Sequence, residues 1–392
     1  MSSSPGRVAM VGHDRQIHVM DLATGAGRRV TVPKHQSPLA RWGQTPGDER
    51  SLWPCWSPDG RWIACFQSRR ADDDPSVVSV VQVDGVEERE LVELTRSAPI
   101  YAAWSADGAQ LAVLSQGPDE LEIGVVPVNL SRDYRVVERG VPLFFCWNPD
   151  GARLMLHVGD RAQRAARLVT HDLRLGGSVL LSEAPGAFCT PVYAGSRPVY
   201  VSDHLGASWV TTSGVERGRS ASLATFDGLL ALVPEPGGEG VVVGAAPRGE
   251  GSPYAGLWRV ALDGSAVTRL TEQDCMAFFL TPDGRRIVYA SVDRSAGCLL
   301  WRVVDLCGGP PRELCPFWPS PEQLFYLHFF EQFALSHSPI SADSRTLVYS
   351  SLVGMPGPDG EPPPGHVLAL DLDDPDAQPR SLGEGSFAVC SP

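Results

Sequence analysis

A turn motif that returns along the chain is the sequence feature that most constrains the fold. Each copy combines a serine, threonine or asparagine, usually a proline, then an aspartate and usually a glycine. The copies run from Trp56 to Gly60, from Trp104 to Gly108, from Trp147 to Gly151 and from Thr281 to Gly284, with a weaker copy from Ser341 to Ser344. One supersecondary unit that repeats every few tens of residues indicates a repeat architecture, whatever the other features are.

Each copy of the motif predicts a β-hairpin. Proline presets φ, aspartate bonds to the backbone two residues on, and glycine supplies the positive φ of a tight turn. A β-branched run follows, such as Val77 to Val83 or Leu299 to Leu306, and then a short closing run such as Val267 to Thr271. Four short strands per unit, without a long helical period, predict an all-β protein made of four-stranded antiparallel propeller blades.

The spacing of the copies predicts an eight-bladed β-propeller. Trp56 and Trp104 are 48 residues apart, and Trp104 and Trp147 are 43 apart. The 133 residues from Asn148 to Thr281 correspond to about three such periods, so two blades with degraded motifs are expected between them. Seven blades is the alternative, if one degraded unit is an elaborated loop. The expected blades are residues 7–33 with 386–392, 54–94, 99–140, 141–186, 187–228, 229–274, 275–315 and 334–385.

The two ends of the chain are expected to close the ring. The segments from Val8 to Val11 and from Phe387 to Cys390 both read as strands. We expect the C-terminal strand to be the innermost strand of the first blade, because closure hides edge strands that would otherwise promote aggregation. A β-sandwich or a solenoid is the alternative, although a solenoid needs capping repeats instead of self-closure. The expected domain is a single propeller spanning residues 1–392.

Composition narrows the class of protein. No apolar run of about 18 residues exists, and Met1 to Gly12 lacks the pattern of a signal peptide. The nine cysteines form no Cys-x-x-Cys pair, and Cys298, Cys307 and Cys315 have the wrong spacing for zinc. The net charge of −13 disfavours nucleic acid and anionic membranes as partners. We therefore expect a cytoplasmic protein with reduced, buried thiols, no membrane insertion, no metal and no cofactor.

The repeats resemble the TolB-type, WD-like β-propeller repeat family, whose unit ends its hairpin with Ser-Pro-Asp-Gly and is widespread in bacteria. The resemblance is strongest over Trp56 to Phe66, Trp104 to Leu114, Trp147 to Leu156 and Thr281 to Tyr289, and it extends over most of the chain. It is specific for the fold and implies no particular activity. The same type of propeller precedes the hydrolase domain of prolyl-oligopeptidases, where it gates or binds peptides. This chain has no Gly-x-Ser-x-Gly motif, so the resemblance implies only a ring able to hold a peptide.

The first departure from the minimal repeat is an insertion at residues 34–53. It contains Arg41, Trp42, Arg50 and Trp53. Long loops in compact domains tend to be functional, and Trp with Arg is the composition of protein-recognition hot spots. We expect a recognition loop, and the alternative is a loop folded over the ring with its tryptophans as local packing.

The second departure is an insertion at residues 316–333, which begins Pro316-Phe317-Trp318. Ser320 as N-cap, Pro321 at the first helical position and Gln323 in a capping box predict one short helix of three turns near 320–333. Its aromatic residues are too many for one buried stripe. It is either a plug that packs a channel opening or an apolar recognition platform. The polar contacts of such a platform would be Tyr326, His328, Glu331 and Gln332.

Two further sets of residues are candidates for ligand contact. Arg69 and Arg70 could clamp a carboxylate, although Asp72 to Asp74 could neutralise them or form a calcium site, and a solvated loop is the favoured interpretation. Tyr101, Phe144 and His337 are expected on innermost strands that line the channel. No catalytic residue and no metal ligand is assigned. The candidate binding residues are Arg41, Trp42, Arg50, Trp53, Arg69, Arg70, Tyr101, Phe144, Phe317, Trp318, Tyr326, His328 and His337.

Three functions are compatible with these features. The first is a non-catalytic binding protein that holds a peptide or protein segment on one face or in the channel, and presents it to partner enzymes. The second is a lyase or hydrolase with its active site at the channel mouth, which would need convergent histidines or carboxylates. The third is a structural scaffold whose partners dock on its rim.

Overall fold

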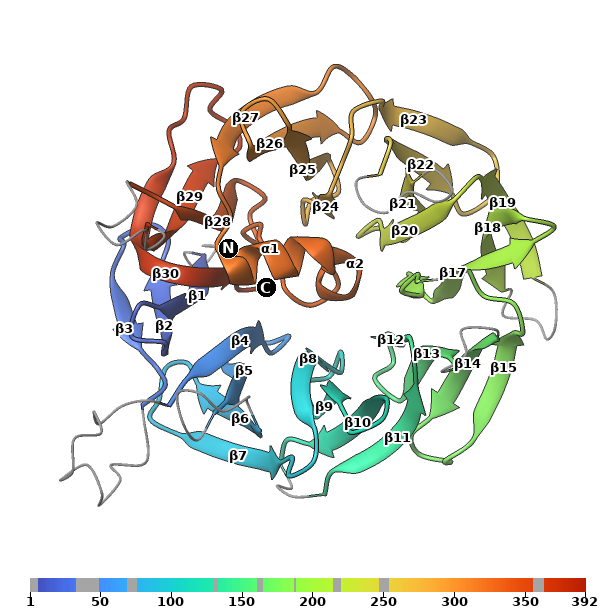
Figure 1. Ribbon diagram of the computed structural model, residues 1–392, viewed down its shortest axis with the longest axis horizontal. Coiled ribbons are helices and arrows are strands. Elements are labelled where there is room, and N and C mark those ends of the chain that lie inside the picture. Colours follow the sequence, from blue (N-terminus) through green and yellow to red (C-terminus); the bar gives the residue numbers. More distant parts are fainter. Residues whose placement is uncertain are drawn as a thin grey trace.

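The fold is a ring of β-sheets around a central channel that holds two short helices (Figure 1). The computed structural model describes residues 6–32, 49–68, 76–129, 133–160, 165–186, 188–213, 220–246, 254–354 and 363–392. Within this part of the chain, no helix is long and apolar enough to cross a membrane. The loop arginines and tryptophan at positions 41, 42, 69 and 70 lie outside the described residues, so their proposed roles stay predictions.

Six of the sheets have four antiparallel strands that follow one another along the chain. The first contains β4 (Ser51–Trp56), β5 (Trp62–Gln67), β6 (Val77–Gln82) and β7 (Glu88–Glu93). The second contains β8 (Ala98–Trp104), β9 (Gln110–Gln116), β10 (Leu121–Pro127) and β11 (Arg135–Gly140). The third contains β12 (Leu143–Trp147), β13 (Arg153–Gly159), β14 (Ala166–Asp172) and β15 (Ser178–Ser182).

The next three sheets have the same form. They contain β16 (Val192–Ala194), β17 (Arg197–His204), β18 (Ala207–Ser213) and β19 (Ser220–Phe226); then β20 (Leu229–Pro234), β21 (Gly240–Ala246), β22 (Leu257–Ala261) and β23 (Val267–Thr271); then β24 (Ala277–Leu280), β25 (Arg286–Asp293), β26 (Cys298–Asp305) and β27 (Arg312–Phe317). The first two of these are the units whose turn motifs are degraded. Both are complete four-stranded sheets, so neither is an elaborated loop.

The last sheet has six strands and closes the ring. Its order is β28 (Thr346–Leu352), β29 (Gly365–Asp371), β30 (Arg380–Cys390), β1 (Arg7–Gly12), β2 (Ile17–Asp21) and β3 (Gly27–Arg29). The first half of β30 pairs with β29, and its second half pairs with β1 in the register Val8↔Cys390. The expected closure by the C-terminal strand is therefore confirmed.

The main prediction of eight separate blades is wrong, and the described strands form the seven blades of the alternative count. The reason differs from the expected one. The repeat unit at 334–385 has only the isolated bridge Ile340↔Leu347 where other units have an innermost strand. It also shares the long strand β30 with the N-terminal unit, so the two units form one continuous sheet.

The turn motif is held by its own side chains. In the second copy, the Ser105 hydroxyl donates to Asp107 Oδ1 at 2.6 Å, and the Ala109 N–H donates to the same oxygen at 3.0 Å. These bonds hold the pKa of Asp107 below its ordinary value. Gly108 has a φ of 68°, as the tight turn requires. The same hydroxyl–carboxylate bond recurs at Ser57, Thr281 and Ser341.

The tryptophan before the turn joins neighbouring blades. Trp56 Nε1 donates to Val389 O at 3.2 Å, Trp104 Nε1 to Cys55 O at 3.0 Å, and Trp147 Nε1 to Ala103 O at 2.9 Å. Each acceptor lies on the innermost strand of the preceding blade. Three successive blade junctions therefore share one hydrogen bond that the repeat itself encodes.

All nine cysteines are free thiols. Eight of them are buried, and burial raises the pKa of Cys55 to about 12. Cys307 is exposed, which departs from the expectation of buried thiols throughout.

We predict that Trp104→Phe lowers the free energy of unfolding by about 1–3 kcal/mol more than Trp301→Phe does, measured by urea denaturation. Both changes remove the same atoms from a buried indole. The first leaves Cys55 O without its donor, whereas Trp301 Nε1 has no hydrogen-bond partner among the described residues. Equal losses for the two variants would contradict a stabilising role for the junction bond.

Candidate functional site

The first two residues of the predicted insertion at 316–333 belong to β27, and the rest forms α1 (Pro321–His328) and α2 (Phe330–Phe333) inside the ring (Figure 1). Ser320 is the N-cap, as predicted, and accepts from the Gln323 N–H at 3.1 Å. The predicted single helix of three turns is wrong, because Phe329 leaves helical geometry at φ −108° and ψ 26°. The capping box is wrong too, since Gln323 Oε1 accepts from the Ser350 N–H of β28. We call residues 318–338 the plug.

Polar side chains of the plug are used to hold it to the blades. Gln332 Nε2 donates to Phe145 O at 2.8 Å, and Gln332 Oε1 accepts from Phe145 N at 3.1 Å, so its amide pairs with β12 as a strand would. Within the plug, Tyr326 donates from its hydroxyl to His337 O at 2.7 Å. Ser320 donates to Ser386 O of β30. The predicted contacts Tyr326 and Gln332 are thus engaged within the molecule.

Aromatic side chains fill the space between the plug and the inner strands. Tyr326 stacks on Phe279 with ring centroids 5.4 Å apart, and Phe330 packs against Phe278 at 4.9 Å. Phe333 lies 5.1 Å from Tyr101 and 5.2 Å from Trp53. The inward side of this segment therefore matches the plug interpretation. Trp53 belongs to the same packing and is not part of a free loop tip.

Glu331 is the one acidic side chain of α2. Its Oε1 accepts from the Tyr254 hydroxyl at 2.6 Å, and its Oε2 accepts from the Thr190 N–H at 3.3 Å. Burial raises the pKa of this carboxyl to about 7, although both hydrogen bonds act to lower it. The plug is thus tied to two further blades through a group that ionises near neutral pH.

A second side of the plug is exposed, together with Val353 of the loop after β28. Trp318 is 48% exposed, Phe329 46%, Leu324 44%, Val353 42% and Phe325 36%. Phe325 and Phe329 contact each other at 4.8 Å. Trp318 and Val353 are joined through the bond from Leu352 N to Trp318 O. We call these five residues the plug patch.

The plug patch lies at one end of the ring. Trp318 follows β27 and precedes α1, and Ser320 is bonded at Ser386, where the inner half of β30 begins. The turn motifs lie at the opposite end, where the inner strands finish. His328, a predicted contact, is exposed beside Phe329, with ring centroids 4.9 Å apart. It borders the plug patch.

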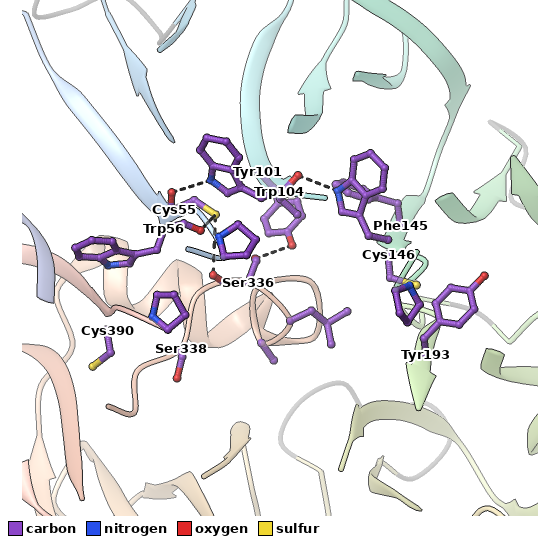
Figure 2. Close-up of a pocket in the computed structure, with 17 residues that line it drawn as sticks. Cys55, Trp56, Tyr101, Trp104, Phe145, Cys146, Tyr193, Ser336, Ser338 and Cys390 are labelled. Carbon is purple, nitrogen blue, oxygen red and sulfur yellow. Dashed lines mark hydrogen bonds between the residues drawn. The ribbon is translucent and has the colours of Figure 1, made fainter. Parts of the chain in front are cut away.

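A hollow of about 420 Å³ opens at the end with the turn motifs (Figure 2). Its walls come from inner strands and turns, and its floor is the last part of the plug. The lining residues are Cys55, Trp56, Pro58, Tyr101, Ala103, Trp104, Phe145, Cys146, Trp147, Pro149, Tyr193, Ala334, Leu335, Ser336, Ser338, Cys390 and Pro392. None of these described lining residues has an acidic, basic or imidazole side chain.

Ser336 sits on the floor of the hollow between two polar partners. Its hydroxyl lies 2.7 Å from the Tyr101 hydroxyl and 2.7 Å from His337 Nδ1. Burial lowers the pKa of His337 to about 3, so the imidazole is neutral near pH 7. No carboxylate of the described chain hydrogen-bonds to that imidazole. The arrangement resembles two members of a catalytic triad without the third.

The other predicted contact residues are spread over the molecule. Phe317 is buried and stacks on Trp301 at 4.9 Å, so it is not on a recognition surface. Phe144 lies on β12, 5.7 Å from His157. Arg50 precedes β4 and donates from its backbone N–H to Ser68 Oγ at 3.1 Å. Contrary to expectation, His337 follows α2 and is not on an innermost strand.

Several residues of the plug patch and of the hollow could not be identified from the sequence. Leu324 and Val353 complete the plug patch, and they carry no signal beyond apolarity. Tyr193 and Leu335 line the hollow from segments without a turn motif. The tryptophans of the motif were identified as repeat markers, but their place around a hollow depends on how the inner strands converge.

The fold and these two surfaces define a β-propeller whose channel is closed by an internal plug. No protein-family model matches the chain, and no curated protein matches it. Among the described residues, no group of three or more His, Cys, Asp or Glu side chains is placed to hold a metal ion.

Similar solved structures support the fold. A eukaryotic initiation factor aligns at 10% identity over 100% of this chain and 99% of its own, with a TM-score of 0.57. An oligogalacturonate lyase in complex with manganese aligns at 15% identity over 90% of this chain and 94% of its own, with a TM-score of 0.55. A putative TolB from Agrobacterium tumefaciens aligns at 17% identity over 80% and 90%, with a TM-score of 0.41. The sheets of the ring confirm the propeller expected from TolB-type repeats, and the likenesses to the initiation factor and the lyase concern the fold alone.

We predict that Glu331→Gln stabilises the protein at pH 8 relative to the native chain and has little effect at pH 5. A carboxyl whose pKa is raised from 4.5 in the unfolded chain to about 7 in the fold stabilises the folded state below pH 4.5, and this contribution is lost as pH rises to about 7. The expected difference is on the order of 1–2 kcal/mol, since Glu331 is only partly shielded from solvent.

Urea denaturation of both proteins at the two pH values measures this difference. Glu322→Gln, on the first turn of α1, is the control and should shift stability equally at both. A change in stability on Glu331→Gln that is the same at both pH values would refute the raised pKa of Glu331.

Proposed function

We propose that this propeller is a non-catalytic, cytoplasmic binding protein that holds a peptide or protein segment on the plug patch. The exposure of three aromatic and two aliphatic side chains, four on the plug and one on the loop after β28, is the observation that carries the proposal. Contiguous exposed apolar side chains are typical of interaction surfaces, because a soluble protein otherwise buries them.

The composition of the plug patch suits recognition of a segment with apolar anchor residues. Aromatic residues dominate the energetic centre of protein interfaces, and Trp318, Phe325 and Phe329 supply three of them. The polar side chains of the plug that could otherwise bond to a ligand are already hydrogen-bonded to Phe145, His337 and Ser386. The surface therefore offers mainly apolar contact, with His328 at its edge.

Rigidity favours binding at this surface. The plug is bonded to β12, β28 and β30 and to the segments that carry Thr190 and Tyr254. A preorganised surface loses less conformational entropy when it binds. The net charge of −13 favours a segment whose flanks are neutral or basic. Presentation of that segment to partner enzymes is part of the proposal.

We expect peptides selected from a random library on the purified protein to need the plug patch. Phe329→Ser and Trp318→Ser should each weaken their binding by about 30-fold, the loss expected for an aromatic hot spot of roughly 2 kcal/mol. Leu180→Ser is the matched control, because Leu180 is 49% exposed on the outer strand β15 and should be neutral. Fluorescence anisotropy of labelled peptides measures all three. Undiminished affinity in both patch variants would refute the proposal.

An enzyme with its active site in the hollow is the second candidate, and the Ser336 hydroxyl between Tyr101 and His337 favours it. A serine nucleophile needs a base that is held by a third group, and His337 has no such partner among the described residues. We therefore expect a fluorophosphonate probe to leave Ser336 unlabelled, as read by mass spectrometry of the digested protein. Labelling that disappears in Ser336→Ala would support the enzyme instead.

A further inference from the structure

The hollow at the turn-motif end has walls that are fixed before any ligand arrives. Trp56, Trp104 and Trp147 line it, and each indole is tethered by its Nε1 bond to the preceding blade. Such tethers hold the rings in single positions, so the hollow keeps its shape.

The floor is fixed in the same way. Ser338 O accepts from the Cys390 N–H at 2.8 Å, and Ala334 N donates to Phe330 O at 2.6 Å. Ser336 is held by the Tyr101 hydroxyl (Figure 2) and by His337 Nδ1. Because the plug forms this floor, the hollow is blind, and no polypeptide can thread from it through the channel.

The lining of the hollow disfavours charged ligands. The ionisable side chains of the lining are phenols and thiols, and burial raises the pKa of Tyr101, Tyr193, Cys55, Cys146 and Cys390, which keeps all five neutral near pH 7. A charged ligand would lose hydration here without gaining a counter-charge from any described lining side chain. Nucleotides, phosphates and amino acids are thus disfavoured.

The lining also indicates what shape and polarity fit. Indole and phenol rings make up much of the wall, and aromatic rings pair well with other aromatic rings. The Tyr101–Ser336 hydroxyl pair offers one place for a hydrogen bond on the floor. A volume of about 420 Å³ lies within the range of small-molecule sites.

From these features we infer that the hollow is a binding site for a small, uncharged aromatic molecule with one hydrogen-bonding group. The site is independent of the plug patch, since the plug separates the two and they open at opposite ends of the ring. The ligand and a peptide on the plug patch can therefore bind together.

Indole is the probe that tests this site, with indole-3-acetate and tryptamine as its anionic and cationic counterparts. Ligand-detected NMR titration of the full chain should show that indole binds at least about tenfold more tightly than either charged analogue. Equal binding of the three compounds, or no binding of indole, would overturn the inference.

Variants locate the binding. Ala334→Phe adds a ring on the floor and should abolish indole binding. Ser336→Ala keeps the volume but removes the hydroxyl and should weaken binding about three- to tenfold, which preserves the test if the larger substitution does not fold. Phe329→Ser, on the plug patch, is the matched control and should change nothing. If indole binds folded Ala334→Phe and Ser336→Ala as tightly as it binds the native chain, its site lies outside the hollow and the inference is wrong.

A competition experiment distinguishes two possible occupants of the hollow, a small ligand and a side chain of a bound peptide. Peptides selected on the plug patch should leave indole binding unchanged. Displacement of indole by such a peptide would show that the hollow receives a peptide anchor instead and would overturn the inference.

Discussion

The indole N–H of one blade bonded to a carbonyl of the blade before it is the interaction on which this ring depends. A propeller blade buries both of its faces against its neighbours, and apolar packing alone does not set the distance between two inner strands. The bonds of Trp56, Trp104 and Trp147 set it at three successive junctions. The first of these bonds has Val389 of β30 as its acceptor, so the series starts at the strand pair that closes the ring. Closure by β30 and β1 and spacing by tryptophan are therefore parts of one arrangement.

The plug gives the ring two different ends. A channel wide enough to admit α1 and α2 would otherwise be open to water, and aromatic side chains such as Phe330 and Phe333 fill it. The side of the plug that cannot reach the blades remains exposed as an apolar surface. Its last residues form the floor of a hollow whose described lining side chains carry no charge. One insertion thus creates both surfaces, and an apolar partner on one of them does not obstruct the other.

The repeat chemistry could be predicted because it is local. Proline, aspartate and glycine act on φ and on hydrogen bonds within five residues, and the Ser105–Asp107 bond forms as that local logic requires. The N-cap at Ser320 is predictable for the same reason. The role of Gln323 could not be predicted, because its side chain accepts a hydrogen bond from the backbone N–H of Ser350, which is distant in sequence, and not from the N-cap. The prediction of eight blades failed because β30 is one long strand that pairs with β29 along one half and with β1 along the other, which joins two repeat units in one sheet.

Strand-like segments at both ends of the chain indicated that the ring closes between Val8 and Cys390. By itself, the sequence determined the hairpins, the four-stranded units and the presence of a helical insertion. These follow from turn geometry, from alternation of apolar residues and from capping, which act over a few residues. Only the tertiary structure decided that the aromatic insertion enters the channel, that Phe317 and Tyr326 are buried while Trp318 and Phe329 are not, and that Ser336 faces a hollow. Residues hundreds of positions apart meet at the centre of a ring, and burial there depends on how the inner strands converge, which no local pattern encodes.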